Sequence, residues 1–197
     1  MGFWEVAPGE ETAQNGHWVE APADDFLKVV FKRFGSPPII AEDLGTITPD
    51  VNETIRKFKL PGMRVLQFAF GGDFPHSTHL PHFHEKNCVV YTGSHDNNTS
   101  VGWYESEIDD ATKDNFHQYL GRQPDREEIH WELIRLAMMS VACATVIPLQ
   151  DLVGLGPEAR MNTPGLGEGN WAWRMTGDQF TPAVRERLES MTRTYGR

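Results

Sequence analysis

Cysteine, positive charge and long apolar runs are all scarce in this sequence. Its 197 residues include only two cysteines, Cys88 and Cys143, too few for a disulfide framework or a thiolate zinc site, so we expect two buried, reduced thiols. No apolar run is long enough to cross a bilayer and no charged-then-apolar leader opens the chain, which predicts a soluble, intracellular protein. The formal net charge of -10 disfavours a nucleic acid or an anionic membrane as partner.

Short apolar runs alternate with amphipathic segments along the chain. The expected helices cover residues 24–34, 107–120, 125–143 and 181–195, with another that begins at Pro49, and the expected strands cover residues 38–41, 64–70, 88–92 and 144–149. Four such alternations predict a parallel sheet with helices outside it, joined by right-handed crossovers. We therefore expect an α/β fold in which residues 1–197 belong to a single domain, with the content of half an eightfold barrel.

Acidic residues follow two of the expected strands. The stretch I-I-A-E-D-L-G spans Ile39 to Gly45 and carries Glu42, and Y-T-G-S-H-D-N-N spans Tyr91 to Asn98 and carries Asp96. Catalytic groups in parallel α/β folds gather where strands end, so these carboxylates are candidates for chemistry. Two carboxylates suit glycoside chemistry, in which one protonates the leaving oxygen and another stabilises positive charge on the sugar ring. The neighbouring Asp43 is more simply explained as a cap on the following turn.

Aromatic and histidine side chains offer two further readings. Six tryptophans are many for this length, and Trp171 beside Asn170 in G-N-W-A-W-R suits the flat face and hydroxyls of a sugar, whereas Trp131 lies on an amphipathic helix and is expected in the core. The loop of residues 71–87 contains four histidines: His76, His79, His82 and His84. Their spacing favours hydrogen bonds made locally or to a sugar over a metal site, because they share no helical face and no carboxylate completes the set.

Six motifs taken in order resemble one family. They are I-I-A-E-D-L-G-x-I-T, L-P-G-M-R-V-L-Q-F-A-F, V-V-Y-T-G-S-H-D-N, P-L-Q-D-L-V-G-L-G, A-R-M-N-T-P-G and G-N-W-A-W-R. Together they resemble the carboxyl-terminal part of the 4-alpha-glucanotransferases of glycoside hydrolase family 77, over residues 3–174. The resemblance implies a partial (β/α)8 TIM barrel, strands five to eight with their helices, that moves α-1,4-glucan segments between maltooligosaccharides with retention of configuration.

The resemblance also implies roles for particular residues. Glu42 would be the general acid/base after the fifth strand, and Asp96 the third carboxylate, which grips the ring hydroxyls and favours the distorted sugar. The expected substrate-binding residues are His95, Asn97, Asn170 and Trp171. No metal or cofactor is implied. The expected location is the cytoplasm, or the plastid stroma if the source is a plant or an alga.

One element of the family's chemistry is not found in this sequence. The family's nucleophile is the Asp of an R-x-D-H-F-R-G motif that ends the fourth strand, and no Arg-x-Asp-His occurs in these 197 residues. We therefore expect a fragment that is inactive alone, tends to self-associate, and has the amino-terminal half of the barrel as its partner. Asn98 stands where the family more usually has an Asp. Two alternatives stay open, a non-catalytic glucan-binding protein derived from the same barrel and a metal-dependent α/β hydrolase that uses the histidine loop.

Overall fold

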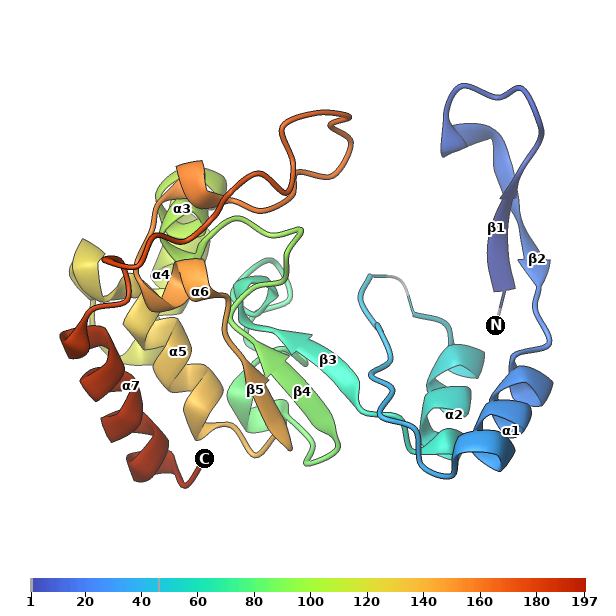
Figure 1. Cartoon of the computed structure of the whole chain (residues 1–197), viewed down its shortest axis with the longest axis horizontal. Coiled ribbons are helices and arrows are strands. Elements are labelled where there is room, and N and C mark those ends of the chain that lie inside the picture. Colours follow the sequence, from blue (N-terminus) through green and yellow to red (C-terminus); the bar gives the residue numbers. More distant parts are fainter. Residues whose placement is uncertain (1, 46) are drawn as a thin grey trace. The chain divides into compact units, whose positions relative to one another are not determined.

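The chain divides into two compact units. The structure is a computed structural model that describes residues 2–45 and 47–197. The amino-terminal unit comprises residues 1–62 and the carboxyl-terminal unit residues 63–197. Figure 1 labels the helices and strands of both units. Among the described residues, no helix has the length and apolar character that a bilayer-spanning segment requires.

The amino-terminal unit begins with a β-hairpin that the sequence patterns did not predict. Strands β1 (Gly2–Val6) and β2 (Gly16–Glu20) pair antiparallel, and the register places Trp4 opposite Trp18. The two indole rings meet edge to face, with centroids 5.5 Å apart. Trp4 Nε1 also donates a hydrogen bond to the Ala13 carbonyl oxygen at 2.8 Å, in the 3-10 turn Ala13–Asn15. Cross-strand aromatic contact of this kind stabilises a hairpin whose strands lack a regular apolar alternation.

Two helices complete this unit, close to the predicted positions. Helix α1 covers Ala23–Phe34 and ends at Gly35, whose φ of 74° lies in the left-handed region that glycine adopts freely. Helix α2 covers Pro49–Phe58, with its proline in the first turn as predicted. Phe31 of α1 and Phe58 of α2 pack with ring centroids 5.5 Å apart. The pair holds the two helices together.

The strand predicted over residues 38–41 does not form. These residues are irregular, and the Ala41 amide donates a hydrogen bond to the Pro61 carbonyl oxygen at 2.8 Å, in the segment before β3. Pro37 and Pro38 lack amide hydrogens, so neither can donate to a strand ladder. The prediction was therefore wrong in type, although the segment does run beside Pro61.

The carboxyl-terminal unit contains a three-stranded sheet. Strands β3 (Gly62–Val65), β4 (Cys88–Tyr91) and β5 (Ala144–Val146) lie in the order β3-β4-β5, and β4 and β5 are parallel. Three of the four predicted strands are thus confirmed, but those predicted over residues 64–70 and 144–149 are shorter. After Val65 the chain turns into a 3-10 helix, Leu66–Phe68. That turn buries Leu66, Ala69 and Phe70 together, which an extended strand with alternating faces would not do.

Helices follow the strands in this unit. They are α3 (Ser100–Gly102), α4 (Asp110–Leu120), α5 (Ile129–Met139), α6 (Leu149–Leu152) and α7 (Pro182–Tyr195), with a π-helical turn Trp103–Glu107 and 3-10 turns Pro81–Phe83, Arg126–Glu128 and Pro157–Ala159. Helices α4, α5 and α7 confirm three predicted helices, with later starts or earlier ends. Helix α5 stops at Met139 because Ser140 is extended and hydrogen-bonds His84 and the Ala142 amide with its hydroxyl.

Helix α5 lies at the centre of the core. One face joins the cluster around Phe70 and Phe116, whose rings meet edge to face at 4.9 Å. The other face carries Trp131, which is buried as predicted and packs with α7 residues. In Figure 1, α7 lies beside α5. Because both faces are covered, the single apolar stripe predicted for this helix was incomplete.

The two cysteines differ from expectation in one respect. Cys88 is buried and Cys143 is exposed, and both are free thiols. The expectation that both are buried was therefore wrong for Cys143. Its Sγ hydrogen-bonds the Cys88 carbonyl oxygen at 3.1 Å, at the start of β5. In the described sheet β5 is an edge strand, so its outer side is not covered by another strand.

Candidate functional site

Two loops of the carboxyl-terminal unit meet around Asp96. Residues 92–99 follow β4, and residues 160–171 follow the turn Pro157–Ala159. Backbone contact joins the loops, since the Asn162 amide donates to the His95 carbonyl oxygen at 3.1 Å. The first loop leaves the carboxyl end of a parallel strand, which is where α/β enzymes place reactive groups.

The Asp96 carboxylate is accessible and oriented. Its side chain is 48% exposed. Asn162 Nδ2 donates to Asp96 Oδ1 at 2.5 Å, and His95 Nε2 lies 3.3 Å from the same oxygen. The carboxylate is therefore held through one oxygen while the group as a whole faces solvent. This arrangement suits a charged group that acts on a bound ligand.

Arg160 ties the surrounding backbone together. Its Nη2 donates to the Asp96 carbonyl oxygen at 2.7 Å, its Nε to the Asn162 carbonyl oxygen at 2.9 Å, and its Nη1 to Glu107 Oε1 at 2.7 Å. Glu107 Oε1 also accepts from Asn98 Nδ2 at 3.1 Å. An aspartate at position 98 could not donate that bond and would set a second negative charge beside Glu107. Asn98 is thus compatible with the glutamate that fixes Arg160.

His95 and Trp171 form an exposed aromatic surface beside Asp96. Their ring centroids lie 5.2 Å apart at an interplanar angle of 35°. Trp171 is 53% exposed, and its amide donates to the Met161 carbonyl oxygen at 2.7 Å. Its φ of 60° is left-handed, an uncommon conformation for a residue other than glycine. The loop therefore turns sharply at the point where it presents the indole.

The amides of Asn97 and Asn170 are engaged within their own loops. Asn97 Oδ1 accepts from the Ser94 amide at 2.9 Å and from the Ser94 hydroxyl at 2.8 Å. Asn170 Oδ1 accepts from the Thr163 amide at 2.8 Å, and its Nδ2 donates to the Leu166 carbonyl oxygen at 2.9 Å. Both side chains thus shape the loops that carry Asp96 and Trp171. Their predicted contacts with sugar stay a prediction.

A buried carboxylate that sequence reasoning missed lies beneath the first loop. Asp151 of α6 is 1% exposed. Its Oδ2 accepts from the Thr92 hydroxyl at 2.5 Å and its Oδ1 from the Ser100 amide at 2.6 Å. Burial raises the pKa of the Asp151 carboxyl, while both hydrogen bonds favour the ionised form. The signal for Asp151 in the sequence is its place in the motif P-L-Q-D-L-V-G-L-G, which indicates the family but no role for this residue. Arg160 and Asn162 lie in the motif A-R-M-N-T-P-G and were missed for the same reason.

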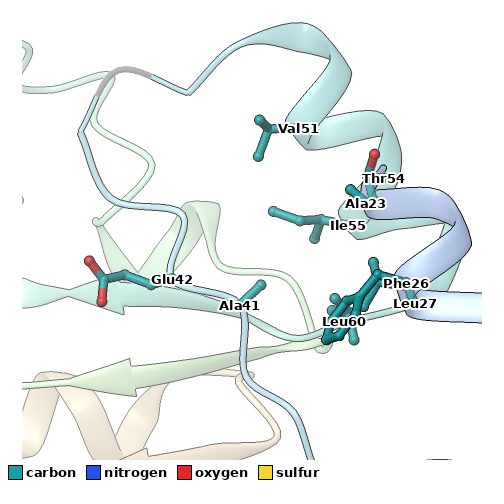
Figure 2. A pocket seen from close by; sticks show the side chains of 9 residues that line it. All are labelled: Ala23, Phe26, Leu27, Ala41, Glu42, Val51, Thr54, Ile55 and Leu60. Atoms are coloured by element: carbon teal, nitrogen blue, oxygen red, sulfur yellow. The ribbon is translucent and has the colours of Figure 1, made fainter. Parts of the chain in front are cut away.

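Glu42 lies in the amino-terminal unit, where it is exposed at one side of a cavity of about 250 Å³. Apart from Glu42 and Thr54, the cavity is lined by apolar side chains, which are Ala23, Phe26, Leu27, Ala41, Val51, Ile55 and Leu60. Figure 2 shows the Glu42 carboxylate pointing away from these side chains. A cavity with so few polar groups does not suit a sugar. The part of Glu42 that could take part in chemistry is therefore its exposed carboxylate, and not the cavity beside it.

Asp43 has different surroundings from Glu42. Asp43 is half-buried, and a Cβ added at Gly62 would lie only 2.4 Å from its Oδ2. The Asp43 carboxylate therefore packs directly on the glycine backbone of L-P-G-M, at the start of β3. Such a position suits a structural role, whereas the capping of the following turn stays a prediction.

Three histidines of the loop make hydrogen bonds, but most of their partners lie outside the loop, so the prediction of local bonds is confirmed only for the bond between His84 and His79. His79 Nδ1 accepts from the Val65 amide at 3.0 Å, and His82 Nδ1 lies 3.1 Å from the Tyr119 hydroxyl. His84 bonds the Ser140 hydroxyl at 2.7 Å and the His79 carbonyl oxygen at 2.9 Å. Across residues 2–45 and 47–197, no three His, Cys, Asp or Glu side chains gather in a way that could hold a metal ion.

Comparison with known proteins identifies the family. The profile of glycoside hydrolase family 77, described as 4-alpha-glucanotransferase, matches residues 1–180. A 4-alpha-glucanotransferase of Synechocystis sp. is 45% identical over 196 residues, which cover 99% of this chain and 38% of the relative. The chloroplastic/amyloplastic 4-alpha-glucanotransferase of Solanum tuberosum is 43% identical over 199 residues, which cover 100% of this chain and 34% of the relative.

A solved structure agrees with these matches. The amylomaltase of Streptococcus agalactiae, in complex with acarbose, superposes with a TM-score of 0.92 at 31% identity, covering 98% of this chain and 39% of that chain. The chain thus spans 38% of the length of the Synechocystis relative and a similar share of this amylomaltase. The α/β fold is that of amylomaltase over the shared part, and the chain belongs to glycoside hydrolase family 77, the 4-alpha-glucanotransferases.

Proposed function

We propose that the protein containing this chain transfers α-1,4-glucan segments between maltooligosaccharides with retention of configuration. The observation that carries the proposal is the site around Asp96. An accessible carboxylate, fixed by Asn162 and by the Arg160 bond to its backbone, lies beside the exposed surface of His95 and Trp171. A flat aromatic face matches the C–H face of a glucose unit, and the polar atoms beside it match ring hydroxyls.

Asp96 acts on the charge that develops in the sugar ring. Retaining transfer passes through an oxocarbenium-like transition state, and a fixed negative charge stabilises such a state more than the neutral substrate. Its contacts with Asn162 and Arg160 hold Asp96 in place before the substrate binds, so no reorganisation is needed during the reaction. His95 contributes a hydrogen-bonding ring nitrogen to the same sugar, and Trp171 contributes the stacking surface.

Glu42 is the general acid/base in this proposal. It protonates the oxygen of the departing glucan and later removes a proton from the acceptor hydroxyl. Retention also needs a carboxylate nucleophile about 5 to 5.5 Å from the acid/base. The family supplies that nucleophile from an Arg-x-Asp-His motif, which these 197 residues do not contain. We therefore assign the nucleophile to the part of the relatives that this chain does not cover.

Strands β3, β4 and β5, together with the segment of residues 38–41, correspond in this proposal to strands five to eight of a (β/α)8 barrel. The order β3-β4-β5 and the parallel pairing of β4 with β5 support the assignment. Beside and within the edge strand β5, Val141 and Val146 are 55% and 43% exposed. The first half of the barrel would cover such an edge, and in its absence the chain would self-associate. By analogy with its relatives, the protein would act in the cytoplasm or, in a plant or alga, in the plastid stroma.

The direct test is Glu42→Gln in the longer protein. The amide keeps the shape of the side chain but cannot deliver a proton, so maltotriose disproportionation should fall about 100- to 10,000-fold while maltooligosaccharide binding persists. Glu53→Gln is the matched control, because Glu53 is an exposed glutamate on α2. Transfer by Glu42→Gln within about tenfold of the unmodified protein would remove Glu42 from the mechanism.

A second test separates the enzyme from a non-catalytic glucan-binding protein. The purified 197-residue chain is incubated with maltotriose, alone and after addition of a separately expressed amino-terminal half. Glucose and longer oligosaccharides should form only in the mixture, since retention requires the missing nucleophile. Transfer by the chain alone would refute the assignment of the nucleophile. Sugar binding with no transfer in the mixture or in the longer protein would favour the binding protein.

A further inference from the structure

The short helix α6 lies beneath both loops of the Asp96 site. Its two adjacent residues Gln150 and Asp151 are 7% and 1% exposed. Asp151 accepts hydrogen bonds from Thr92 and Ser100, the residues that flank the segment 93–99. Gln150 Nε2 donates to the Ala159 carbonyl oxygen at 3.2 Å, directly before Arg160. One helical turn therefore anchors the loop that carries Asp96 and the start of the loop that carries its partners.

The carboxylate of Asp151 closes the base of the first loop. One oxygen binds the residue before the segment 93–99 and the other binds the residue after it, at 2.5 and 2.6 Å. Asp96 lies in the middle of that segment, where its own contacts come from the facing loop through Asn162 and Arg160. The position of Asp96 thus depends on two anchors, and Asp151 is the one that lies within the core.

The cost of burying this group indicates that the contact matters. Both donors to Asp151 are uncharged, a hydroxyl and a backbone amide, so no cation offsets the removal of the carboxylate from water. Burying an apolar residue of similar size would cost less free energy. The buried carboxylate is therefore favoured only if its hydrogen bonds serve a purpose that an apolar side chain cannot. What these two bonds fix is the separation of Thr92 from Ser100, and hence the path of the loop between them.

We propose that Asp151 is a positioning residue for glucan transfer. Its two hydrogen bonds, from the Thr92 hydroxyl and the Ser100 amide, form a clasp that holds Asp96 in position relative to its substrate. The inference rests on the proposed function of Asp96. Asp151 itself touches no substrate. A displacement of about 1 Å at a reacting group can cost about 100-fold in rate, so a buried residue beneath the loop can affect turnover strongly.

The substitutions distinguish hydrogen bonding from charge. Asp151→Leu removes both bonds and should lower kcat by about 100-fold with a much smaller change in KM. Asp151→Asn retains an oxygen for the Ser100 amide, and its NH2 group can donate to the Thr92 oxygen, so it should restore kcat to within about threefold of the unmodified protein. Thr92→Val removes one bond and should give an intermediate loss, of about tenfold.

The matched control is a second buried carboxylate. Glu132 of α5 is 4% exposed and pairs with Arg122 and Arg135, on a helix outside both loops. Glu132→Leu should lower the melting temperature yet leave kcat within about threefold at temperatures where the variant is folded. A purely structural role for Asp151 would give the same result for Asp151→Leu. The comparison therefore separates positioning from stability.

The experiment uses the longer protein with maltotriose, together with hydrogen exchange of the peptide that spans residues 92–100. Asp151→Leu should lose kcat and exchange this peptide faster, while Glu132→Leu should do neither. An Asp151→Leu protein that keeps kcat and KM would overturn the proposal, as would failure of Asp151→Asn to restore kcat. Where Asp151→Leu does not fold, Thr92→Val decides, because unchanged turnover in that variant refutes the clasp. If the unmodified protein has no transferase activity, the proposed function fails. In that case the clasp is still supported if residues 92–100 exchange more slowly in the unmodified protein than in Asp151→Leu, and refuted if they exchange equally fast.

Discussion

His84 should make the carboxyl-terminal unit sensitive to mild acid. It is 7% exposed. Nε2 donates to the His79 carbonyl oxygen and Nδ1 accepts from the Ser140 hydroxyl, so the neutral ring satisfies both of its hydrogen bonds. Burial, with the nearby charge of Arg64 as a smaller cause, lowers the pKa of His84 from 6.5 to about 4. In the unfolded chain the same ring binds a proton at the ordinary pKa.

The sign and size of the effect follow from that difference. Because the folded pKa lies below the unfolded one, the stability from neutral His84 is present above pH 6.5 and is lost as the pH falls towards about 4. Each pKa unit is worth about 1.36 kcal/mol, so the full loss is on the order of 3 kcal/mol, of which about 2 kcal/mol is lost by pH 5. Burial also lowers the pKa of His130 to about 4, so His130 adds a separate loss of stability in acid.

The assay is urea unfolding of the 197-residue chain at pH 7.5 and pH 5, followed by tryptophan fluorescence. The variant His84→Gln cannot titrate, so its free energy of unfolding should fall by about 2 kcal/mol less over this range than that of the unmodified chain. His130 is present in both proteins and cancels in the comparison. His76→Gln serves as control, because His76 is exposed in the same loop. If His84→Gln loses as much stability as the unmodified chain, burial of a neutral His84 is not what makes the fold sensitive to acid.

Two further predictions concern the site and the histidine loop. Asp96→Asn in the longer protein should lower kcat more than KM, because the lost charge matters most when the sugar ring becomes cationic, and steady-state kinetics with maltotriose will measure both constants. A rise in KM alone would make Asp96 a binding residue. Treatment with a chelator should change neither the melting temperature of the chain nor its binding of maltooligosaccharides, since transfer by carboxylates needs no metal. A lower melting temperature after chelation would instead support a metal site in the loop of residues 71–87.

The elements that the sequence predicted well are those with local causes. Helices α1, α4, α5 and α7 show their apolar spacing and terminal residues within one stretch of chain, as at Gly35 after α1. The hairpin β1–β2 was missed because its main stabilising contact pairs Trp4 with Trp18 across the strands. Residues 38–41 do not form the predicted strand because Pro38 and the preceding Pro37 cannot donate to a ladder, although the apolar side chains that follow suit a strand.

In the candidate site too, features with local sequence signals were predicted and those that depend on long-range contacts were not. Asp96, His95 and Trp171 were expected from residue type and motif, and the structure brings these three side chains together. The supporting groups could not be found in this way, because their contacts join distant parts of the chain. Asn162 reaches Asp96 across 66 residues, and Asp151 reaches Thr92 across 59. A polar residue within an apolar run, as Asp151 is, gives no sign of its partner until the fold is known.

The left-handed backbone at Trp171 places two demands on one position. Its φ of 60° suits glycine or asparagine, and a bulky residue there costs on the order of 1 to 3 kcal/mol. The exposed indole, in contrast, is the part that faces His95. Natural or laboratory variation at position 171 therefore meets a conflict, since residues that relax the backbone remove the aromatic surface. Selection for heat resistance would favour glycine or asparagine at position 171, whereas selection for turnover would favour tryptophan.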